Sequence, residues 1–424
     1  MTAVNEDTSY IMLDSTISPG LLGLPADVIV LILASWSDID SLKALRASCW
    51  YICQSFKEAE ATICSSVITA QIGSAFVPEA AVALAARKLP RENIPTFELF
   101  VGQHLESPRS IGQHLESPRS ICPPLSLTDA NSIDDLAYHV EYFSNRACKY
   151  LFPLRQSYGS QPETSVVERI RIKRALYTFE MFCHLFTRQQ AYVLPLVRES
   201  ESCRINMAWA RCYDVFAAHE VEQLSCIEYM LTQDIRVALK CNPLIATDHV
   251  IGDRRIEEIL SRGLCYVRKI INASRIPKVM VELLPRAPGH PELPLLREEF
   301  VYRYTELFRP HPPSGVGRST KLRDYPEQVK AAFLRRFLRS ARFPDHDAGP
   351  SNVFLYVHEG KTLAVGRSRF HDADFWVWGY VFWDLARLAR LGVFSESEAD
   401  PNDESLLRVD VREAIQHLKG TRNE

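Results

Sequence analysis

Apolar residues near the start of the chain recur at the spacing of short amphipathic helices. Leu24-Pro25-Ala26-Asp27 has the composition of a helix start, because proline fits the first turn and an acidic side chain interacts favourably with the free amides there. Apolar residues then follow at helical intervals, at Val28, Ile29, Ile32, Leu33 and Trp36. Asp38 is suited to cap a second helix, whose apolar positions are Leu42, Leu45, Cys49, Ile52 and Phe56. The pattern predicts two short helices joined by an acidic turn.

The rest of the chain is predicted to be helical almost throughout. Helical spacing continues over residues 57–90, with a break at Pro78, and returns over 172–186, 203–240 and 253–272. Asn352–His358 and Thr362–Val365 are rich in β-forming residues and flank a turn at Glu359-Gly360, which predicts a hairpin. Trp376 to Leu391 predicts a last helix, ended by Gly392. The predicted fold class is therefore mainly α, with one small β-hairpin near 352–365.

A tandem duplication separates the predicted parts of the chain. Gly102–Ile111 is repeated without change as Gly112–Ile121. Repeat folds need longer and more numerous units, so we interpret this duplication as added length in a surface loop. The predicted organisation is a leader, a short helical module, a helical extension, a loop with the duplication, and a large helical domain, at 1–20, 21–56, 57–100, 101–128 and 129–420.

Composition narrows the class of protein. The 424 residues are 46% hydrophobic and 24% charged, as in ordinary globular proteins, and the net charge of −3 argues against binding to nucleic acid or membranes through bulk charge. The eleven cysteines form no CxxC pair, so we predict reduced thiols rather than a zinc site, and a cytoplasmic or nuclear location. Met1 to Pro19 is polar and acidic, unlike a secretory signal. The longest apolar runs have seven residues, whereas a membrane-spanning helix needs about 20.

One cluster of polar residues leaves an enzymatic alternative open. Asp347 and Asn352 have the Asp-to-Asn spacing of a kinase catalytic loop, and Asp372 or Asp374 would supply a later metal-binding carboxylate. The neighbouring histidines are His346 and His371. However, no glycine-rich phosphate loop and no lysine-bearing strand precede them, and the later aspartates are also suited to cap a helix. We therefore predict no catalytic residue, no metal and no cofactor, and keep an intracellular phosphotransferase as the alternative.

Residues 21–56 resemble the F-box, the short helical module that joins substrate receptors to the Skp-family adaptor of cullin–RING ubiquitin ligases. Leu24-Pro25 matches the opening Leu-Pro of the family, and Asp38 to Leu42 match its acidic turn and the leucine after it. The sequence departs at Trp36, where the family usually has leucine, and at Ile52, near its usual tryptophan. The resemblance covers 36 of 424 residues, counted from 21 to 56.

The resemblance implies which residues bind the adaptor. Carried over by position, they are Leu24, Pro25, Ile29, Ile32, Leu33, Leu42, Leu45 and Cys49. Two further segments, Ala348–Phe354 and Trp378–Asp384, resemble C-terminal sequences of filamentous-fungal F-box proteins, in which the remainder is a helical region without leucine-rich or WD repeats.

A binding surface is also predicted on the last helix. At about 100° per residue, Trp376, Tyr380 and Trp383 fall opposite the apolar stripe that contains Phe382. Trp and Tyr are enriched at binding hot spots, so we predict that these three residues bind a target protein, with a second buried layer as the alternative. The expected function is therefore a non-enzymatic substrate receptor whose partners are the Skp-family adaptor with its cullin complex and an unknown target protein.

Overall fold

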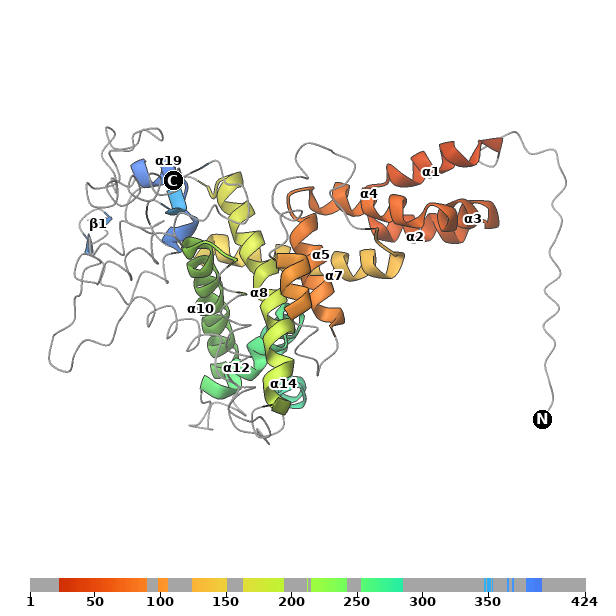
Figure 1. The fold of residues 1–424 in the computed structure, drawn as a ribbon. Coiled ribbons are helices and arrows are strands. Elements are labelled where there is room, and N and C mark those ends of the chain that lie inside the picture. The colour runs from red at the N-terminus through yellow and green to blue at the C-terminus, as the bar shows by residue number, and fades with distance from the viewer. Residues whose placement is uncertain are drawn as a thin grey trace, which may run out of the picture. The chain divides into compact units, whose positions relative to one another are not determined.

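The computed structural model describes seven longer stretches of helix-rich chain together with several shorter segments. They are residues 23–89, 98–105, 124–150, 163–193, 215–241, 253–284 and 379–390, with pieces at 212, 347, 349–351, 353, 364–365 and 368–369. As predicted, the fold is mainly α-helical (Figure 1). The chain divides into two compact units: unit 1 comprises Met1–Gly73 with Cys122–Asp134, and unit 2 comprises Ser74–Ile121 with Asp135–Glu424.

Unit 1 begins with four helices, of which three start before residue 57, where the sequence pattern predicted two. They are α1 (Ala26–Ala34), α2 (Ile39–Ser48), α3 (Trp50–Glu58) and α4 (Glu60–Ile72). The predicted cap is confirmed, because the Asp38 carboxylate accepts the Ser41 amide at 2.7 Å. The second predicted helix is broken at Cys49, which is extended (φ −158°, ψ 158°) and caps α3 by accepting the Ile52 amide on its sulfur at 3.5 Å.

Polar side chains tie the helices of unit 1 together. Gln71 of α4 accepts the amide of Ile39 at 3.3 Å and donates to Asp134 at 2.5 Å. Glu60 accepts the amide of Leu127 at 2.7 Å, and so caps the first turn of α7 (Leu127–Tyr150). The compact unit thus extends past residue 56, where the predicted module ends, to include α4 and the start of α7.

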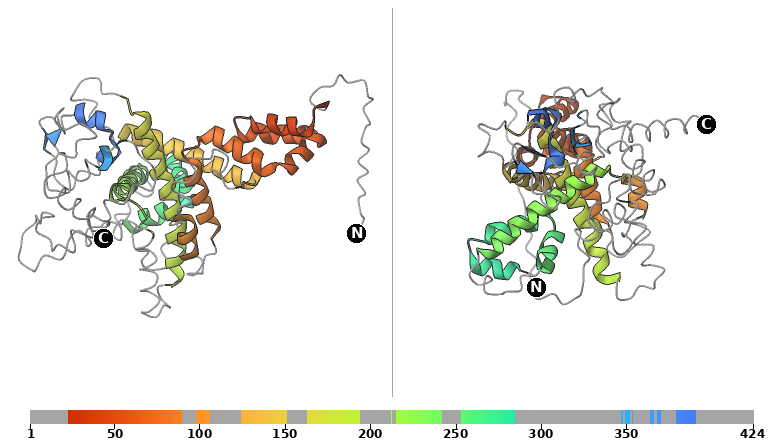
Figure 2. Two further views of the ribbon diagram at one scale, coloured as in Figure 1. Left: turned by 45° about the horizontal axis from the view of Figure 1, so that its top comes forward. Right: turned by 90° about the vertical axis from the view of Figure 1, so that its left-hand side faces the viewer.

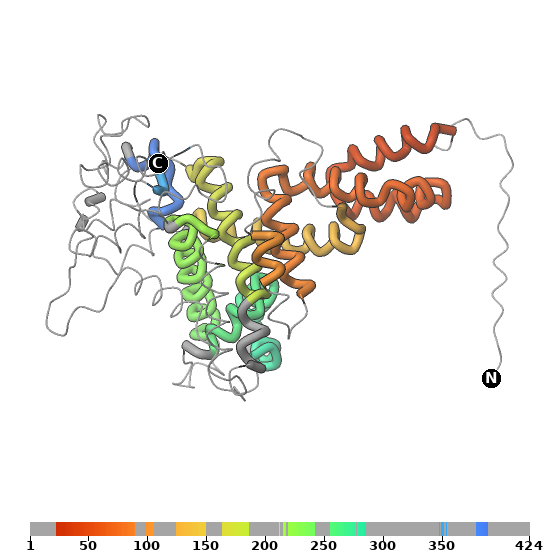
Figure 3. Tube along the Cα trace, viewed as in Figure 1, coloured from red at the N-terminus to blue at the C-terminus, as the bar shows by residue number. Residues whose placement is uncertain are grey.

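Unit 2 is built around the long helix α8 (Val166–Val193). Helices α5 (Val77–Lys88) and α10 (Ala218–Lys240) pack against it, and Figure 2 shows α8 and α10 from two further sides. Helices α12 (Asp253–Ser261) and α13 (Leu264–Ala273) pack on α10, and α14 (Pro277–Leu283) packs on α13. Figure 3 draws the same chain as a tube along its Cα trace.

Two helix boundaries differ from the predicted ones. The break predicted at Pro78 lies instead at Gly73, whose φ of 88° favours glycine. Pro78 stands in the first turn of α5, where a backbone N–H would have no partner within the helix, so its missing N–H costs no hydrogen bond. Part of the predicted loop 101–128 is helical, because Val101–Leu105 forms the π-helix η2 and Leu105 is buried. The second copy of the duplication lies outside the described residues.

The C-terminal part also differs from the prediction. The helix predicted from 376 to 391 is interrupted: Gly379 adopts a left-handed conformation (φ 56°), a 3-10 turn η6 covers Tyr380–Phe382, and α19 covers Leu385–Arg390. A two-stranded antiparallel pair, β1 (Ala364–Val365) with β2 (Ser368–Arg369), stands close to the predicted hairpin. Its register pairs Ala364 with Arg369 and Val365 with Ser368, which differs from the pairing predicted across Glu359-Gly360. Val353, predicted to be in a strand, is helical.

Three of the described cysteines are packing residues. Burial raises the pKa of Cys64 to about 12 and that of Cys183 and Cys226 well above the ordinary thiol value. A thiol with a raised pKa stays protonated at neutral pH and is a poor nucleophile or metal ligand. These three side chains therefore behave as small apolar residues, as the sequence reading expects of most of the thiols.

Among the described helices, no single one is long and apolar enough to cross a bilayer. One bent pair, Glu60–Ile72 with Val77–Lys88, has the length and apolar composition of a membrane-spanning segment.

Gly263 provides a first test of this fold. It precedes α13 with a φ of 83°, and a Cβ there would lie 2.6 Å from the carboxylate of Glu180, which accepts the Leu264 amide at 2.7 Å. Gly263→Ala is expected to lower the free energy of unfolding by at least about 1–2 kcal/mol, because the left-handed conformation and the close carboxylate both oppose a side chain. Urea unfolding measures this. Gly102→Ala is the matched control, since nothing lies within 4 Å of a Cβ there, and an equal loss in both variants would contradict the account.

Candidate functional site

Unit 1 presents exposed apolar residues along one side of α1. The segment from Leu24 to Ala34 is apolar almost all round, which is unusual unless a helix is covered on both sides. Leu31 is 69% exposed and Val28 37%. Val28 stands about one helical turn beyond Pro25, which is also exposed, and Leu31 about one turn beyond Val28. With two half-buried neighbours they form what we call the α1 stripe: Leu24, Pro25, Val28, Leu31 and Ile32.

An exposed aromatic ring lies near the start of α1, in addition to the α1 stripe. Trp50, the first residue of α3, is 76% exposed. The next residue, Tyr51, donates its hydroxyl to the carbonyl of Leu24 at 3.2 Å, which places the start of α3 beside the start of α1. Trp50 is therefore near the beginning of the α1 stripe. An exposed cluster of large apolar side chains marks a surface suited to a protein partner.

The predicted adaptor-binding residues divide into two groups. Leu24, Pro25, Ile32, Leu45 and Cys49 keep exposed surface. Ile29, Leu33 and Leu42 are at most 1% exposed, because they face α3 and α4 and form the core of unit 1. These three side chains hold the helices that carry the exposed residues, and direct adaptor contact through them stays a prediction.

Sequence reasoning did not single out Leu31 or Trp50, and it placed Val28 in the same apolar stripe as Ile29 and Leu33. The available signal was the apolar run 28–34, which places apolar residues on the far side of the helix as well as on the core side. Trp50 gave no such signal, because its exposure depends on the break at Cys49.

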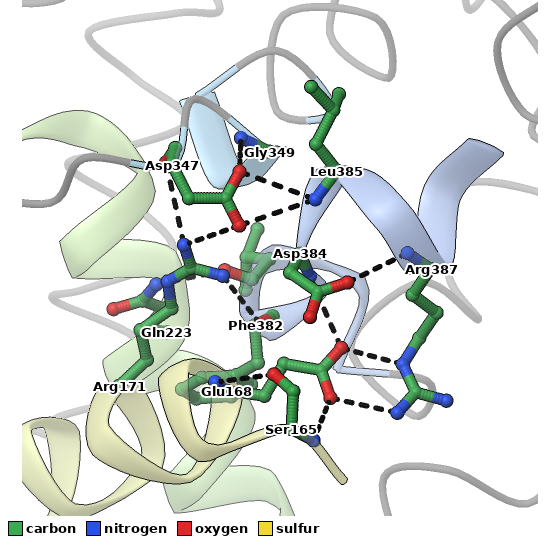
Figure 4. Close-up of polar contacts among 11 residues, drawn as sticks. Ser165, Glu168, Arg171, Gln223, Asp347, Gly349, Phe382, Asp384, Leu385 and Arg387 are labelled. Carbon is green, nitrogen blue, oxygen red and sulfur yellow. Dashed lines mark hydrogen bonds and ion pairs between the residues drawn. The ribbon is translucent and has the colours of Figure 1, made fainter. Parts of the chain in front are cut away.

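Unit 2 contains a buried polar cluster, shown in Figure 4, which includes Asp347 of the enzymatic alternative. Glu168, in the first turn of α8, is fully buried and accepts two hydrogen bonds from the guanidinium of Arg387, at 2.6 and 2.8 Å. Arg387 is only 4% exposed. The same carboxylate also accepts the amides of Ser165 and Asp384, at 2.9 and 3.2 Å. This ion pair fixes α19 to the beginning of α8.

A parallel ion pair fixes the segment around Asp347. Arg171, which is 3% exposed, donates to the Asp347 carboxylate at 3.1 Å and to the carbonyl of Phe382 at 3.1 Å. Asp347 also accepts the amide of Gly349 at 2.8 Å and that of Leu385 at 3.3 Å. Gly349 is tightly enclosed, since a Cβ there would lie 2.8 Å from backbone atoms of Trp383 and Leu385.

This arrangement bears on the phosphotransferase alternative. Both oxygens of the Asp347 carboxylate accept hydrogen bonds, from Arg171 and from two backbone amides, as in a structural ion pair. A general base needs an oxygen that reaches the substrate proton. The other residues of that alternative, His346, Asn352, His371, Asp372 and Asp374, lie outside the described residues. Within the described part of the chain, no group of three His, Cys, Asp or Glu side chains is placed to hold a metal ion.

The two residues of the predicted target-binding face that can be placed, Tyr380 and Trp383, are buried rather than exposed. Tyr380 is 1% exposed and donates its hydroxyl to Glu222 of α10, and Trp383 is 2% exposed. The reason is the interruption at Gly379: a 3-10 turn follows instead of a continuous helix, so the 100° projection does not apply. The structure shows the alternative arrangement, in which these rings form a second buried layer. Trp376 lies outside the described residues.

Comparison with known proteins adds no assignment, because no protein-family model matches the chain and neither a curated protein nor a solved structure shows significant similarity. The geometry of the two units and the F-box resemblance of residues 21–56 are therefore the basis of the functional proposal.

Proposed function

We propose that this protein is a substrate receptor of a cullin–RING ubiquitin ligase, in which unit 1 binds the Skp-family adaptor and unit 2 binds a target protein. The observation that carries the proposal is the α1 stripe, which stands within the segment that resembles the F-box and includes its Leu-Pro start. An adaptor-binding module has to offer apolar side chains to a separate protein, and Pro25, Val28 and Leu31 are exposed.

The size of the α1 stripe supports an interface of useful affinity. A fully buried leucine, isoleucine or valine contributes about 1.5–3 kcal/mol relative to an exposed one. Leu31 and Val28 retain much of their surface for such burial, and Trp50 adds an aromatic ring, a residue type that often dominates binding energy. Part of this gain is offset by the entropy lost on association, so several anchors are needed together.

The proposed role is non-catalytic and intracellular. The receptor positions a target for ubiquitin transfer by other subunits, so its own chain needs no metal, cofactor or nucleophile. A cytoplasmic or nuclear location follows from the same proposal, since the ligase and reduced thiols belong to those compartments.

The N-terminal Leu-Pro gives the first test of the proposal. Leu24→Ala combined with Pro25→Ala removes an apolar anchor and the fixed φ of −55° before α1. We expect the variant to lose co-purification with a co-expressed Skp-family adaptor. Because Pro25 is exposed and Leu24 half-buried, circular dichroism should show an unchanged helix content. Co-purification equal to that of the wild-type chain would remove the main support for the proposal.

A further inference from the structure

Unit 2 carries a second exposed apolar surface, on the helical hairpin formed by α13 and α14. Met280 and Leu284 are buried against α13, and the Tyr266 hydroxyl donates to the carbonyl of Leu283, so α14 is fixed in place. In spite of this packing, Ile276 is 55% exposed, Val279 40% and Val281 47%. Three exposed branched side chains within six residues form a denser cluster than scattered surface residues do.

The apolar residues of α14 are arranged along its sides. At about 100° per residue, Ile276, Val279 and Leu283 fall within one narrow stripe next to the buried Met280, while Val281 falls on the opposite side. Lys278 and Glu282 project about 160–200° away from Met280 and so form the outermost face. A flat bilayer would meet these two charged side chains first, whereas a polypeptide segment lying alongside α14 would contact the stripe.

The charge of the hairpin is strongly positive, although the whole chain is slightly negative. Residues 264–284 contain four cations, Arg268, Lys269, Arg275 and Lys278, against one acid, Glu282. Lys269, Arg275 and Lys278 are exposed, and none of the three has an ion pair with another described residue. Arg268 stacks on two rings of α7, 4.0 Å from the centroid of Tyr138 and 4.4 Å from that of Tyr142. Surface cations gain from nearby carboxylates, and no described residue supplies one to these three.

We infer that the α13–α14 hairpin is the target-docking surface of unit 2, and that its ligand is an acidic polypeptide segment in which Asp or Glu alternates with apolar residues. The apolar residues would lie on Ile276, Val279 and Leu283, and the carboxylates would meet the exposed cations Lys269 and Arg275. The inference rests on the proposed function for its biological meaning, since it states which part of the receptor binds the target and what kind of target sequence it recognises.

The test uses the full chain and a fluorescein-labelled synthetic peptide in which Glu alternates with Leu and Ile, with binding followed by anisotropy. Two double variants are compared with the wild type: Lys269→Glu with Arg275→Glu, and Ile276→Ser with Val279→Ser. Each is expected to weaken binding about tenfold or more, since close charge pairs and central apolar anchors carry most of an interface. Arg87→Glu with Lys149→Glu, two exposed positions on α5 and α7, makes the same charge change and should leave affinity within about twofold.

Four results would overturn the inference. They are failure of the wild-type chain to bind the peptide, equal binding by either hairpin variant, equal binding of a peptide with Ser in place of Leu and Ile, and hairpin-dependent binding to phosphatidylserine vesicles in preference to the peptide. Adaptor binding is measured on the same preparations. If the wild-type chain binds the adaptor but not the peptide, the docking surface alone is rejected. If it binds the peptide but not the adaptor, the proposed receptor function alone is rejected.

Discussion

Glu168→Gln is expected to lower the free energy of unfolding by about 3–5 kcal/mol, because it leaves the guanidinium of Arg387 buried without a counter-charge. Glu168 is fully buried and Arg387 is 4% exposed, so water cannot replace the lost carboxylate. The variant also weakens the hydrogen bonds that the carboxylate accepts from the amides of Ser165 and Asp384. Urea unfolding of the full chain, followed by circular dichroism, measures the change.

A matched exposed ion pair is the control for this prediction. Glu141 lies 2.5 Å from Lys173, and its side chain is 47% exposed. Glu141→Gln should therefore change stability by no more than about 1 kcal/mol. Replacing both partners of the buried pair, as Glu168→Leu with Arg387→Met, should recover much of the loss, since apolar residues can fill such a site. A loss below about 1 kcal/mol for Glu168→Gln would contradict the placement of α19 on α8.

Trp383→Ala is expected to cost about 3–5 kcal/mol, as large-to-small changes of buried aromatic residues do. Its ring is 2% exposed, and the neighbouring Phe382, for which the same loss is expected, is fully buried. Trp50→Ala removes the same side chain from a position that is 76% exposed, and should change stability by less than about 0.5 kcal/mol. Thermal or urea unfolding of both variants decides the point. A loss below about 1 kcal/mol for Trp383→Ala would mean that this ring is on the surface after all.

Local signals predicted the elements that depend on neighbouring residues. The cap at Asp38 and the mainly α-helical fold follow from short-range spacing, and both are found. The break at Cys49 was missed because cysteine is a weak hydrogen-bond acceptor and rarely caps a helix, whereas here its sulfur accepts the Ile52 amide. The turn at Gly379 was missed because helical periodicity continues past it in the sequence.

The side of α1 that becomes core could not be predicted from its own residues. Ile29 and Leu31 are equally apolar, yet the first is fully buried and the second is 69% exposed. The difference comes from the packing of α3 and α4, which a pattern within α1 does not contain. For the same reason the exposed residues of the candidate surface were only partly identified.

The buried cluster of unit 2 depends on contacts across long stretches of sequence. Glu168 and Arg387 are 219 residues apart, so no local pattern joins them. One local signal was present: Ser165 and Glu168 have the spacing of a capping box, and the structure shows both of its hydrogen bonds, at 2.9 and 3.2 Å. That signal marks the start of α8, but the burial of Glu168 and its partner arise only in the folded chain.

Titration of a purified Skp-family adaptor into the full chain, wild type beside Leu31→Asp, tests the central claim most directly. Leu31 is 69% exposed, so the variant should fold normally, and a carboxylate buried without a partner in the interface should weaken binding at least about 100-fold. Thr62→Asp places the same carboxylate on the exposed side of α4 and serves as the control. The account predicts tight binding by the wild type and the control and a severe loss for Leu31→Asp. Equal binding by all three chains, or no binding by the wild type, would contradict it.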